Sequence, residues 1–200
     1  MSSFYSFMQV LLPIFIALLV VALGGLISER SGVTNIALEG FMILGGWIGI
    51  IVMNALLVQF GFAKNFTDVI YINSTTIPAG YKILIFLVAS LAAGALSGIL
   101  SLIHAFSSIS LNTDQTISAT AINTLAPALC LFLNMTLDIG QFEMTSNGQM
   151  PASDKISIAN TAFKIDAVPG LSDIPVIGDI FFKNCYPSFF FGLLILLVLW

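Results

Sequence analysis

Long apolar stretches set the pattern of hydrophobic and polar positions along the chain. Four of them cover residues 8–27, 40–62, 82–106 and 117–137. A helix needs about 20 predominantly apolar residues to cross a hydrocarbon layer about 30 Å thick. The pattern therefore predicts four membrane-spanning helices, followed by a long polar loop over residues 138–187.

A fifth apolar stretch, residues 188–200, closes the sequence. It is too short to cross the membrane, and its last residues, LLILLVLW, have no polar flank that would hold them at an interface. We therefore expect an incomplete fifth span in a chain that is truncated at its C-terminus. Residues 1–200 are predicted to form a single transmembrane domain.

Composition agrees with a membrane location. The chain is 58% hydrophobic and 8% charged, whereas soluble domains carry about 25% charged residues. The predicted fold class is all-α, a polytopic transmembrane helical bundle in contact with membrane lipid. No basic patch indicates a nucleic-acid partner. Cys130 and Cys185 are predicted to be free thiols, because disulfide frameworks belong to small, loop-rich domains.

The third span contains the small-residue sequence SLAAGALSGIL, residues 90–100. With Ala89 just before it, this sequence places Ala93, Gly94, Ser97 and Gly98 at helical spacing. Small side chains let membrane helices approach closely. We expect this face to pack against other helices of the same chain, with a dimer seam as the alternative.

A first polar insertion, SERSGVTNIALEG, covers residues 28–40. One interpretation is a tight, solvated turn between two spans. The other is a broken or re-entrant helix near 28–40, in which Thr34 or Asn35 caps a half-helix that begins at Ile36. Irregular backbone inside a membrane persists only where protein buries it or where it lines a wet cavity. A helix N-terminus in such a cavity binds substrate groups in several transporters.

On the second interpretation, the polar residues of this insertion are candidates for a substrate pathway. They are Ser28, Glu29, Arg30, Asn35 and Glu39. Glu39 falls in the first turns of the predicted half-helix, where the helix dipole favours a carboxylate. That placement is also a sufficient structural role for Glu39.

A second polar insertion covers residues 104–123, HAFSSISLNTDQTISATAIN. Asn112 with Gln115 forms a helix-start pattern, and Asp114 adds a negative charge in the first turn. Asn123 carries a polar side chain into the fourth span, where it either bonds to another helix or lines the pathway. The further pathway candidates are therefore Asn112, Asp114, Gln115 and Asn123.

No catalytic or metal-binding pattern accompanies these insertions. His104 is the only histidine, and it has no second ligand at a suitable spacing, so we expect it to mark the interfacial end of its span. The chain lacks the G-x-x-x-x-G-K-[ST] phosphate loop. The sequence therefore predicts a transport protein rather than an enzyme, without a metal or cofactor of its own.

Three segments resemble the permease subunits of bacterial ABC importers for nucleosides and simple sugars, in the branched-chain amino acid/ribose permease superfamily. They are LGGLISERSGVTNIALEGFMILGGW (23–47), NTDQTISATAIN (112–123) and LSDIPVIGDIFF (171–182). The ER-SG-NI-LEG skeleton of the first is the most specific. Thr34, Ala37 and Asp114 depart from the family pattern, and these departures bear on substrate preference.

The resemblance implies that this chain forms the translocation pathway of an ATP-driven importer by alternating access. Its implied partners are a second permease subunit, ATP-binding cassette subunits that carry the ATP, an extracytoplasmic substrate-binding lipoprotein, and a nucleoside or sugar substrate. It also implies a multi-pass protein of the bacterial plasma membrane, with Arg30 near the inner side and the 138–187 loop outside. A secondary transporter or channel also uses broken helices, and a non-functional permease fragment is the remaining alternative.

Overall fold

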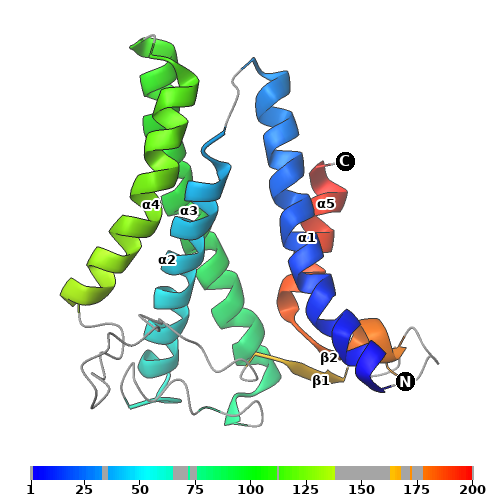
Figure 1. Ribbon diagram of the computed structural model, residues 1–200. Helices are drawn as coiled ribbons and strands as arrows, with labels where there is room; N and C mark the ends of the chain where they lie inside the picture. The colour runs from blue at the N-terminus through cyan, green and yellow to red at the C-terminus, as the bar shows by residue number, and fades with distance from the viewer. Residues whose placement is uncertain are drawn as a thin grey trace, which may run out of the picture.

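A computed structural model describes residues 2–32, 36–64, 72, 76–111, 113–137, 163–167, 172 and 178–199 (Figure 1). The helices are α1 (Ser2–Arg30), α2 (Leu38–Gln59), α3 (Ala79–Ser110), α4 (Gln115–Leu137) and α5 (Pro187–Leu199), with a π-helical turn, η3, over Gly178–Phe182. Strands β1 (Ile165–Ala167) and β2 (Lys183–Cys185) pair antiparallel. Helices α1 to α4 are long and apolar enough to cross a membrane. The predicted all-α, polytopic transmembrane class is confirmed.

The interruption predicted near residues 28–40 is present as the end of one helix and the start of the next. Helix α1 ends at Arg30, Gly32 has a φ of +86°, and α2 begins at Leu38. Glycine adopts this left-handed backbone without a steric cost. The described part of this segment contains no separate re-entrant helix, and residues 33–35 lie outside the description.

Helix α2 ends before the apolar stretch that predicted it. The stretch runs to residue 62, whereas the helix stops at Gln59. Gly61 has a φ of +77°, its N–H donates to the Val58 carbonyl, and the Phe62 N–H donates to the Leu57 carbonyl. These two bonds after a left-handed glycine form a Schellman cap. Backbone geometry, rather than hydropathy, therefore sets this helix end.

The helices form two groups (Figure 1). Helices α2, α3 and α4 pack together, while α5 lies along α1. The rings of Phe86 on α3 and Phe191 on α5 have centroids 5.2 Å apart, which joins the two groups. The connections from α1 to α2 and from α3 to α4 lie at one end, called the turn end. Strands β1 and β2 lie at the opposite end, called the sheet end.

Small residues bring α2 and α3 close together. A Cβ added at Gly45 would lie 2.7 Å from Ser97 Oγ, and one at Gly49 would lie 3.7 Å from Ala93 Cβ. The expected packing role of Ala93 and Ser97 within the chain is therefore confirmed. Gly94 and Gly98 are positioned differently, since nothing lies within 4 Å of a Cβ built there.

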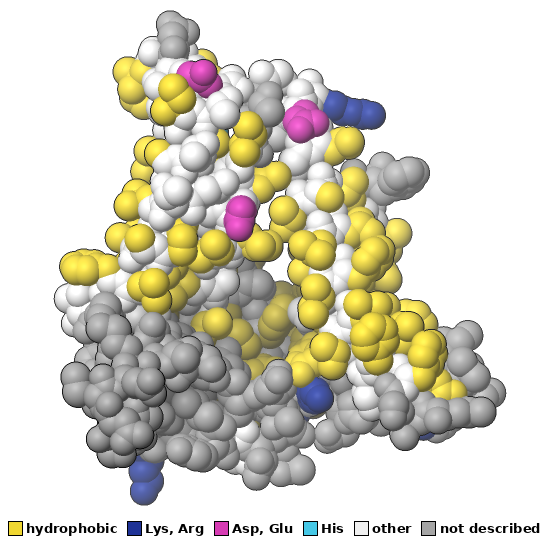
Figure 2. All heavy atoms as spheres, viewed as in Figure 1, with side chains coloured by type: hydrophobic (Ala, Val, Ile, Leu, Met, Phe, Trp, Pro, Cys, Tyr) yellow, Lys and Arg dark blue, Asp and Glu magenta, His cyan; other side chains and the backbone are white. Residues whose placement is uncertain are grey.

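The surfaces of the helices are largely apolar, as contact with lipid requires. Figure 2 shows hydrophobic side chains over both helix groups, with few charged atoms between them. Large apolar side chains such as Leu91 and Leu102 are exposed in the isolated chain. Cys130 and Cys185 are both buried and unbridged, as predicted.

Candidate functional site

Asn123 of α4 lies against the first turn of α2. Its Oδ1 accepts a hydrogen bond from the Gly40 backbone N–H at 2.8 Å, and its Nδ2 donates to the Ile36 carbonyl oxygen at 3.0 Å. Residues four apart are donor and acceptor in an α-helical hydrogen bond. The Asn123 carboxamide therefore replaces the bond between Gly40 and Ile36 that would lengthen α2 at its N-terminus.

This replacement explains where α2 begins. The predicted start of the half-helix at Ile36 is wrong. Ile36 would join the helix only if its carbonyl accepted the Gly40 N–H, and Asn123 is hydrogen-bonded to both of these groups. The N-cap position is instead Ala37, which is fully buried and makes no side-chain capping bond. The proposed caps Thr34 and Asn35 lie outside the described residues.

Gly40 makes the contact with Asn123 sterically possible. A Cβ at this position would lie 2.9 Å from Ile122 Cγ2, 3.0 Å from Asn123 Oδ1 and 3.1 Å from the Ile122 carbonyl oxygen. Real Cβ atoms essentially never approach another atom within 3.0 Å. Gly40 was not among the candidate residues predicted from the sequence. Its position as the last residue of SERSGVTNIALEG could have indicated a role.

The start of α4 is capped by Asp114. Its Oδ1 accepts a hydrogen bond from the Thr116 backbone N–H at 2.8 Å, and the helix begins at Gln115. Asp114 therefore precedes the first turn instead of lying within it, and it takes the capping role expected of Asn112. Asn112 itself lies outside the described residues.

His104 joins α3 to α4, a contact that its predicted place near the end of the span did not indicate. It is 3% exposed, six residues before the end of α3 at Ser110. Its Nδ1 lies 3.0 Å from Ser118 Oγ, and its ring is edge-on to Phe41 with centroids 6.3 Å apart. Its Nε2 is buried and has no hydrogen-bond partner among the described residues.

The remaining candidates lie at the turn end or near it. Ser28, Glu29 and Arg30 form the end of α1, and the carbonyl of Ser28 accepts a bond from Ser31 Oγ at 2.7 Å. Glu29, Arg30, Glu39 and Asp114 are exposed. The structure brings Asn123 to the backbone beside Glu39. The C-terminal part of α1 also reaches the start of α2, since a Cβ at Gly25 would lie 2.9 Å from Leu38 Cδ1. A pathway role for these residues stays a prediction.

An apolar cavity of about 220 Å³ lies between α2, α3 and α4. Its lining is Phe41, Leu44, Leu100, Ile103, Ile122, Leu125, Ala126 and Leu129. No side chain in this list donates or accepts a hydrogen bond. The cavity therefore offers no partner for the hydroxyl groups of a sugar, because buried polar groups need such partners.

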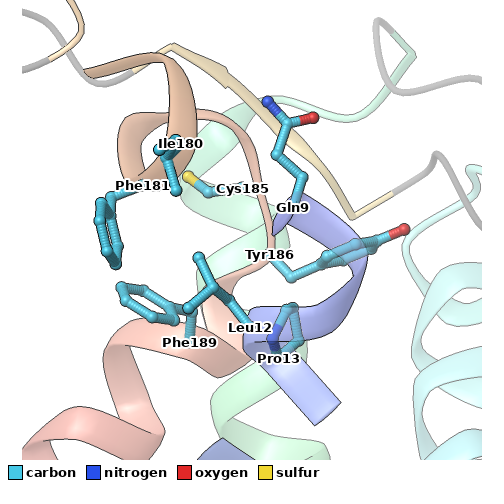
Figure 3. Close-up of a pocket in the computed structure, with 8 residues that line it drawn as sticks. All are labelled: Gln9, Leu12, Pro13, Ile180, Phe181, Cys185, Tyr186 and Phe189. Atoms are coloured by element: carbon cyan, nitrogen blue, oxygen red, sulfur yellow. The ribbon is translucent and has the colours of Figure 1, made fainter. Parts of the chain in front are cut away.

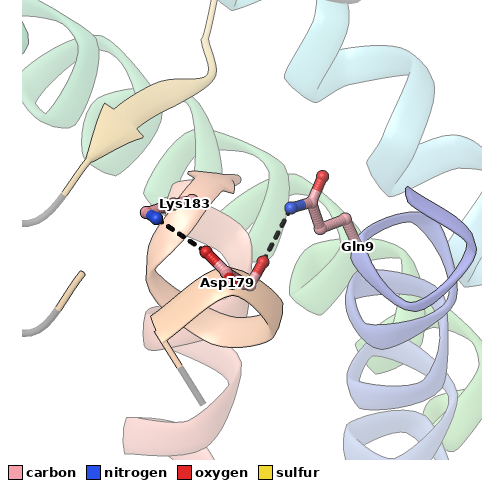
Figure 4. A network of polar contacts seen from close by, with 3 residues as sticks. All are labelled: Gln9, Asp179 and Lys183. Carbon is pink, nitrogen blue, oxygen red and sulfur yellow. Dashed lines mark hydrogen bonds and ion pairs between the residues drawn. The ribbon is translucent and has the colours of Figure 1, made fainter. Parts of the chain in front are cut away.

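Polar contacts at the sheet end tie the short β-sheet region to α1 and α3. Gln9 Nε2 on α1 donates to the Asp179 carbonyl oxygen at 2.9 Å, and Lys183 Nζ pairs with Asp179 Oδ1 at 2.6 Å (Figure 4). On α3, the buried Lys82 ammonium donates to the Lys164 carbonyl oxygen at 2.7 Å. Gln9, the one strongly polar residue in residues 8–27, is thus used for attachment.

Beside Gln9 is a small pocket formed by residues of α1, η3 and the start of α5 (Figure 3). Its volume is about 10 Å³, which is room for about one water molecule. Cys185 lines it, and burial raises the pKa of the Cys185 thiol. The described residues also contain no cluster of three or more His, Cys, Asp or Glu side chains that could hold a metal ion.

Four helices that are long and apolar enough to cross a membrane, and of which α2 and α3 pack through small residues, define a multi-pass membrane protein. The chain belongs to the family described as the permease component of the branched-chain amino acid transport system, which it matches over residues 7–200. Its place is the bacterial plasma membrane, as a multi-pass protein.

Two curated relatives are named as ABC transporter permeases for guanosine or for nucleosides. The chain is 36% identical over 183 residues to the guanosine ABC transporter permease protein NupQ of Bacillus subtilis, a match that covers 92% of this chain and 47% of NupQ. It is 28% identical over 184 residues to the nucleoside ABC transporter permease protein NupC of Lactococcus lactis subsp. cremoris, with the same two coverages. The chain thus spans about half the length of these relatives. No solved structure matches it.

Proposed function

We propose that this chain belongs to the membrane-spanning permease of an ATP-driven importer and contributes to a translocation pathway for nucleosides or related simple sugars. The observation that carries this proposal is the family match over residues 7–200 together with the 36% identity to a guanosine permease. Membership of a permease family also indicates a transport subunit rather than an enzyme.

The N-terminus of α2 is the element that we assign to the pathway. It places the exposed Glu39 carboxylate in the first turn of a helix whose N-terminal end carries a partial positive charge. Nucleosides and sugars present many hydroxyl groups, which bind to such polar elements and not to an apolar cavity. The other assigned residues are Ser28, Glu29, Arg30, Asn35, Asn112, Asp114, Gln115 and Asn123.

In the proposed mechanism, partner subunits carry out the remaining steps of transport. ATP-binding cassette subunits hold and hydrolyse ATP, so this chain needs no cofactor of its own. A second permease subunit forms the other half of the pathway. An extracytoplasmic lipoprotein delivers the nucleoside or sugar. These partners follow from the kind of transporter in which the relatives NupQ and NupC are named as permeases.

The direct test is uptake of radiolabelled guanosine by proteoliposomes that contain the permease with its ATP-binding and substrate-binding partners. We expect uptake that requires ATP and persists when ionophores collapse all ion gradients. An ATPase partner that binds ATP without hydrolysing it is the matched control, and uptake should then fall to background. Labelled ribose, measured in parallel, distinguishes a sugar importer from a nucleoside importer.

A secondary transporter is the second candidate, because broken helices near exposed charges are typical of that class as well. Uptake that continues without ATP and stops when an ion gradient is removed would establish it instead. NupQ in the same vesicles is the positive control. Active NupQ beside an inactive permease with all partners present would identify a non-functional permease fragment.

A further inference from the structure

The contact between Asn123 and α2 fits in one orientation only. The Gly40 N–H is a donor and the Ile36 carbonyl is an acceptor, so the carboxamide must present its oxygen to Gly40 and its NH₂ group to Ile36. Exchanging the two atoms would face donor to donor and acceptor to acceptor. The side chain is therefore held at both ends by the backbone of another helix.

This contact competes with helix formation. Gly40 and Ile36 have the spacing of a normal α-helical bond, and without Asn123 they can bond to each other. The bond from the Phe41 N–H to the Ala37 carbonyl, at 3.1 Å, is the first helical bond of α2, so a bond from Gly40 to Ile36 would extend the helix at its N-terminus. Asn123 takes both partners of that next bond and so sets the residue at which the helix begins.

The same part of α4 is fastened to α3 as well. Ser118 Oγ lies 3.0 Å from Nδ1 of the buried His104. Asn123 and Ser118 are both in the first half of α4, which begins at Gln115. The start of α2 is therefore positioned by α4 through Asn123, and α3 contacts both α4 through His104 and the first turns of α2 at Phe41.

We propose that Asn123 is a positioning residue for transport: it holds the first turn of α2, and with it the Glu39 carboxylate, at a fixed place relative to α4. In this role Asn123 acts through α2, because its Oδ1 and one N–H of its Nδ2 are bonded to the backbone at the start of that helix. The inference rests on the proposed function, in which Glu39 faces the pathway. In this role the contact between Asn123 and α2 keeps Glu39 in place.

The contact itself can be tested without transport. Glu39–Gly40 is the only Glu-Gly step in residues 1–200. With ¹³C-carbonyl glutamate and ¹⁵N glycine in the permease and unlabelled partner subunits, the Gly40 amide is the solid-state NMR resonance that disappears in Glu39→Ala. In Asn123→Ala the Gly40 amide resonance should move, because its acceptor changes. Thr120→Val is the matched control on α4, since the Thr120 hydroxyl bonds only to its own helix, at the Thr116 carbonyl. In that variant the resonance should stay in place.

The positioning role is tested by guanosine uptake with Asn123→Ala, Glu39→Gln and the double variant, compared at equal amounts of assembled complex. We expect each single change to raise KM by about 2- to 10-fold, the factor that corresponds to one net hydrogen bond. Because Asn123 acts through Glu39, the double variant should be no worse than the poorer single variant. Asn123→Asp keeps an acceptor for Gly40 but places its second carboxylate oxygen against the Ile36 carbonyl, so its KM should be at least as high as that of Asn123→Ala.

Each outcome decides one part of the inference. An unchanged Gly40 resonance in Asn123→Ala overturns the contact. A moved resonance with KM effects that multiply in the double variant overturns action through Glu39. Normal uptake by Glu39→Gln, with ATP-dependent transport intact, also overturns the positioning role but leaves the proposed importer standing. Failure of the wild-type complex to transport guanosine or ribose counts against the proposed function alone, because the NMR result does not depend on it.

Discussion

Gly40 places a backbone N–H against a side chain of another helix at a point where any Cβ would collide. In Gly40→Ala the new methyl would meet Ile122 Cγ2, the Ile122 carbonyl and Asn123 Oδ1 at 3.1 Å or less. Two of these atoms are backbone or hydrogen-bonded, so they cannot move freely. We expect a loss of stability of about 1–3 kcal/mol, the usual cost of overpacking, measured as a lower thermal unfolding midpoint in detergent.

Gly46→Ala is the matched control in the same helix, because nothing lies within 4 Å of a Cβ at Gly46. Alanine is the better helix former by up to about 1 kcal/mol, so this change should leave the midpoint equal or higher. Equal midpoints for the two variants would contradict the close approach of α2 and α4.

The sequence alone predicted that Asn123 is important but not which helix it bonds. Its partners Ile36 and Gly40 are 87 and 83 residues away, and a hydropathy pattern contains no information about which faces of two spans meet. The same limit applies to His104, whose contact with Ser118 on α4 could not be read from its place in the sequence. Both polar side chains were visible in the sequence. Their partners are determined only by how the helices pack.

At the scale of elements, hydropathy predicted that each helix exists but not where each helix ends. Helix α1 continues to Arg30 and α3 to Ser110, beyond their apolar stretches, because the helix propensity of a residue is not set by its hydropathy. Helix α2 stops at Gln59 in the middle of apolar sequence because Gly61 forms a cap. Hydropathy indicates which residues can contact lipid, whereas caps and tertiary contacts decide where a helix ends.

The attachment of the η3–β2 region to α1 depends on Gln9. Its bond to the Asp179 carbonyl lies beside the buried Cys185. Gln9→Leu removes this bond, so Cys185 should react about 2- to 10-fold faster with a maleimide, in keeping with the loss of one net hydrogen bond. The rate is measured by mass shift in a Cys130→Ala background. Ser90→Ala is the control, because the Ser90 hydroxyl bonds only within α3.

The pH dependence of that reaction follows from the direction of the Cys185 pKa. The thiolate is the reactive form, and burial raises the pKa of the thiol, so the neutral thiol is favoured at pH 7. The rate in the parent protein should be lower at pH 7 than for an exposed cysteine and should increase with pH up to and beyond pH 8.5. In Gln9→Leu a better-solvated thiol should have a pKa nearer its ordinary value. Its advantage over the parent should therefore be largest at pH 7.

At the scale of the whole molecule, the basic residues do not determine which end faces the cytoplasm. Lys82, Lys164 and Lys183 belong to the sheet end, whereas Arg30 lies near the turn end. A simple count of basic residues would place the sheet end inside. These three lysines are engaged locally: Lys82 is buried on a carbonyl, Lys183 is paired with Asp179, and Lys164 Nζ lies 5.4 Å from the centre of the Tyr186 ring. Lys64, after α2 at the same end, is exposed.

The family resemblance predicts the opposite orientation, with the sheet end outside, and two single cysteines can decide between them. Lys64, after α2, and Thr113, between α3 and α4, are both exposed and belong to opposite ends of the bundle. In a background without Cys130 and Cys185, Lys64→Cys should react with a membrane-impermeant maleimide on intact cells. Thr113→Cys should react only after the membrane is opened. The reverse pattern would place the sheet end in the cytoplasm, and the lysine count would then be the better guide. Because alternating helices fix all connections together, one such pair of results orients the whole chain.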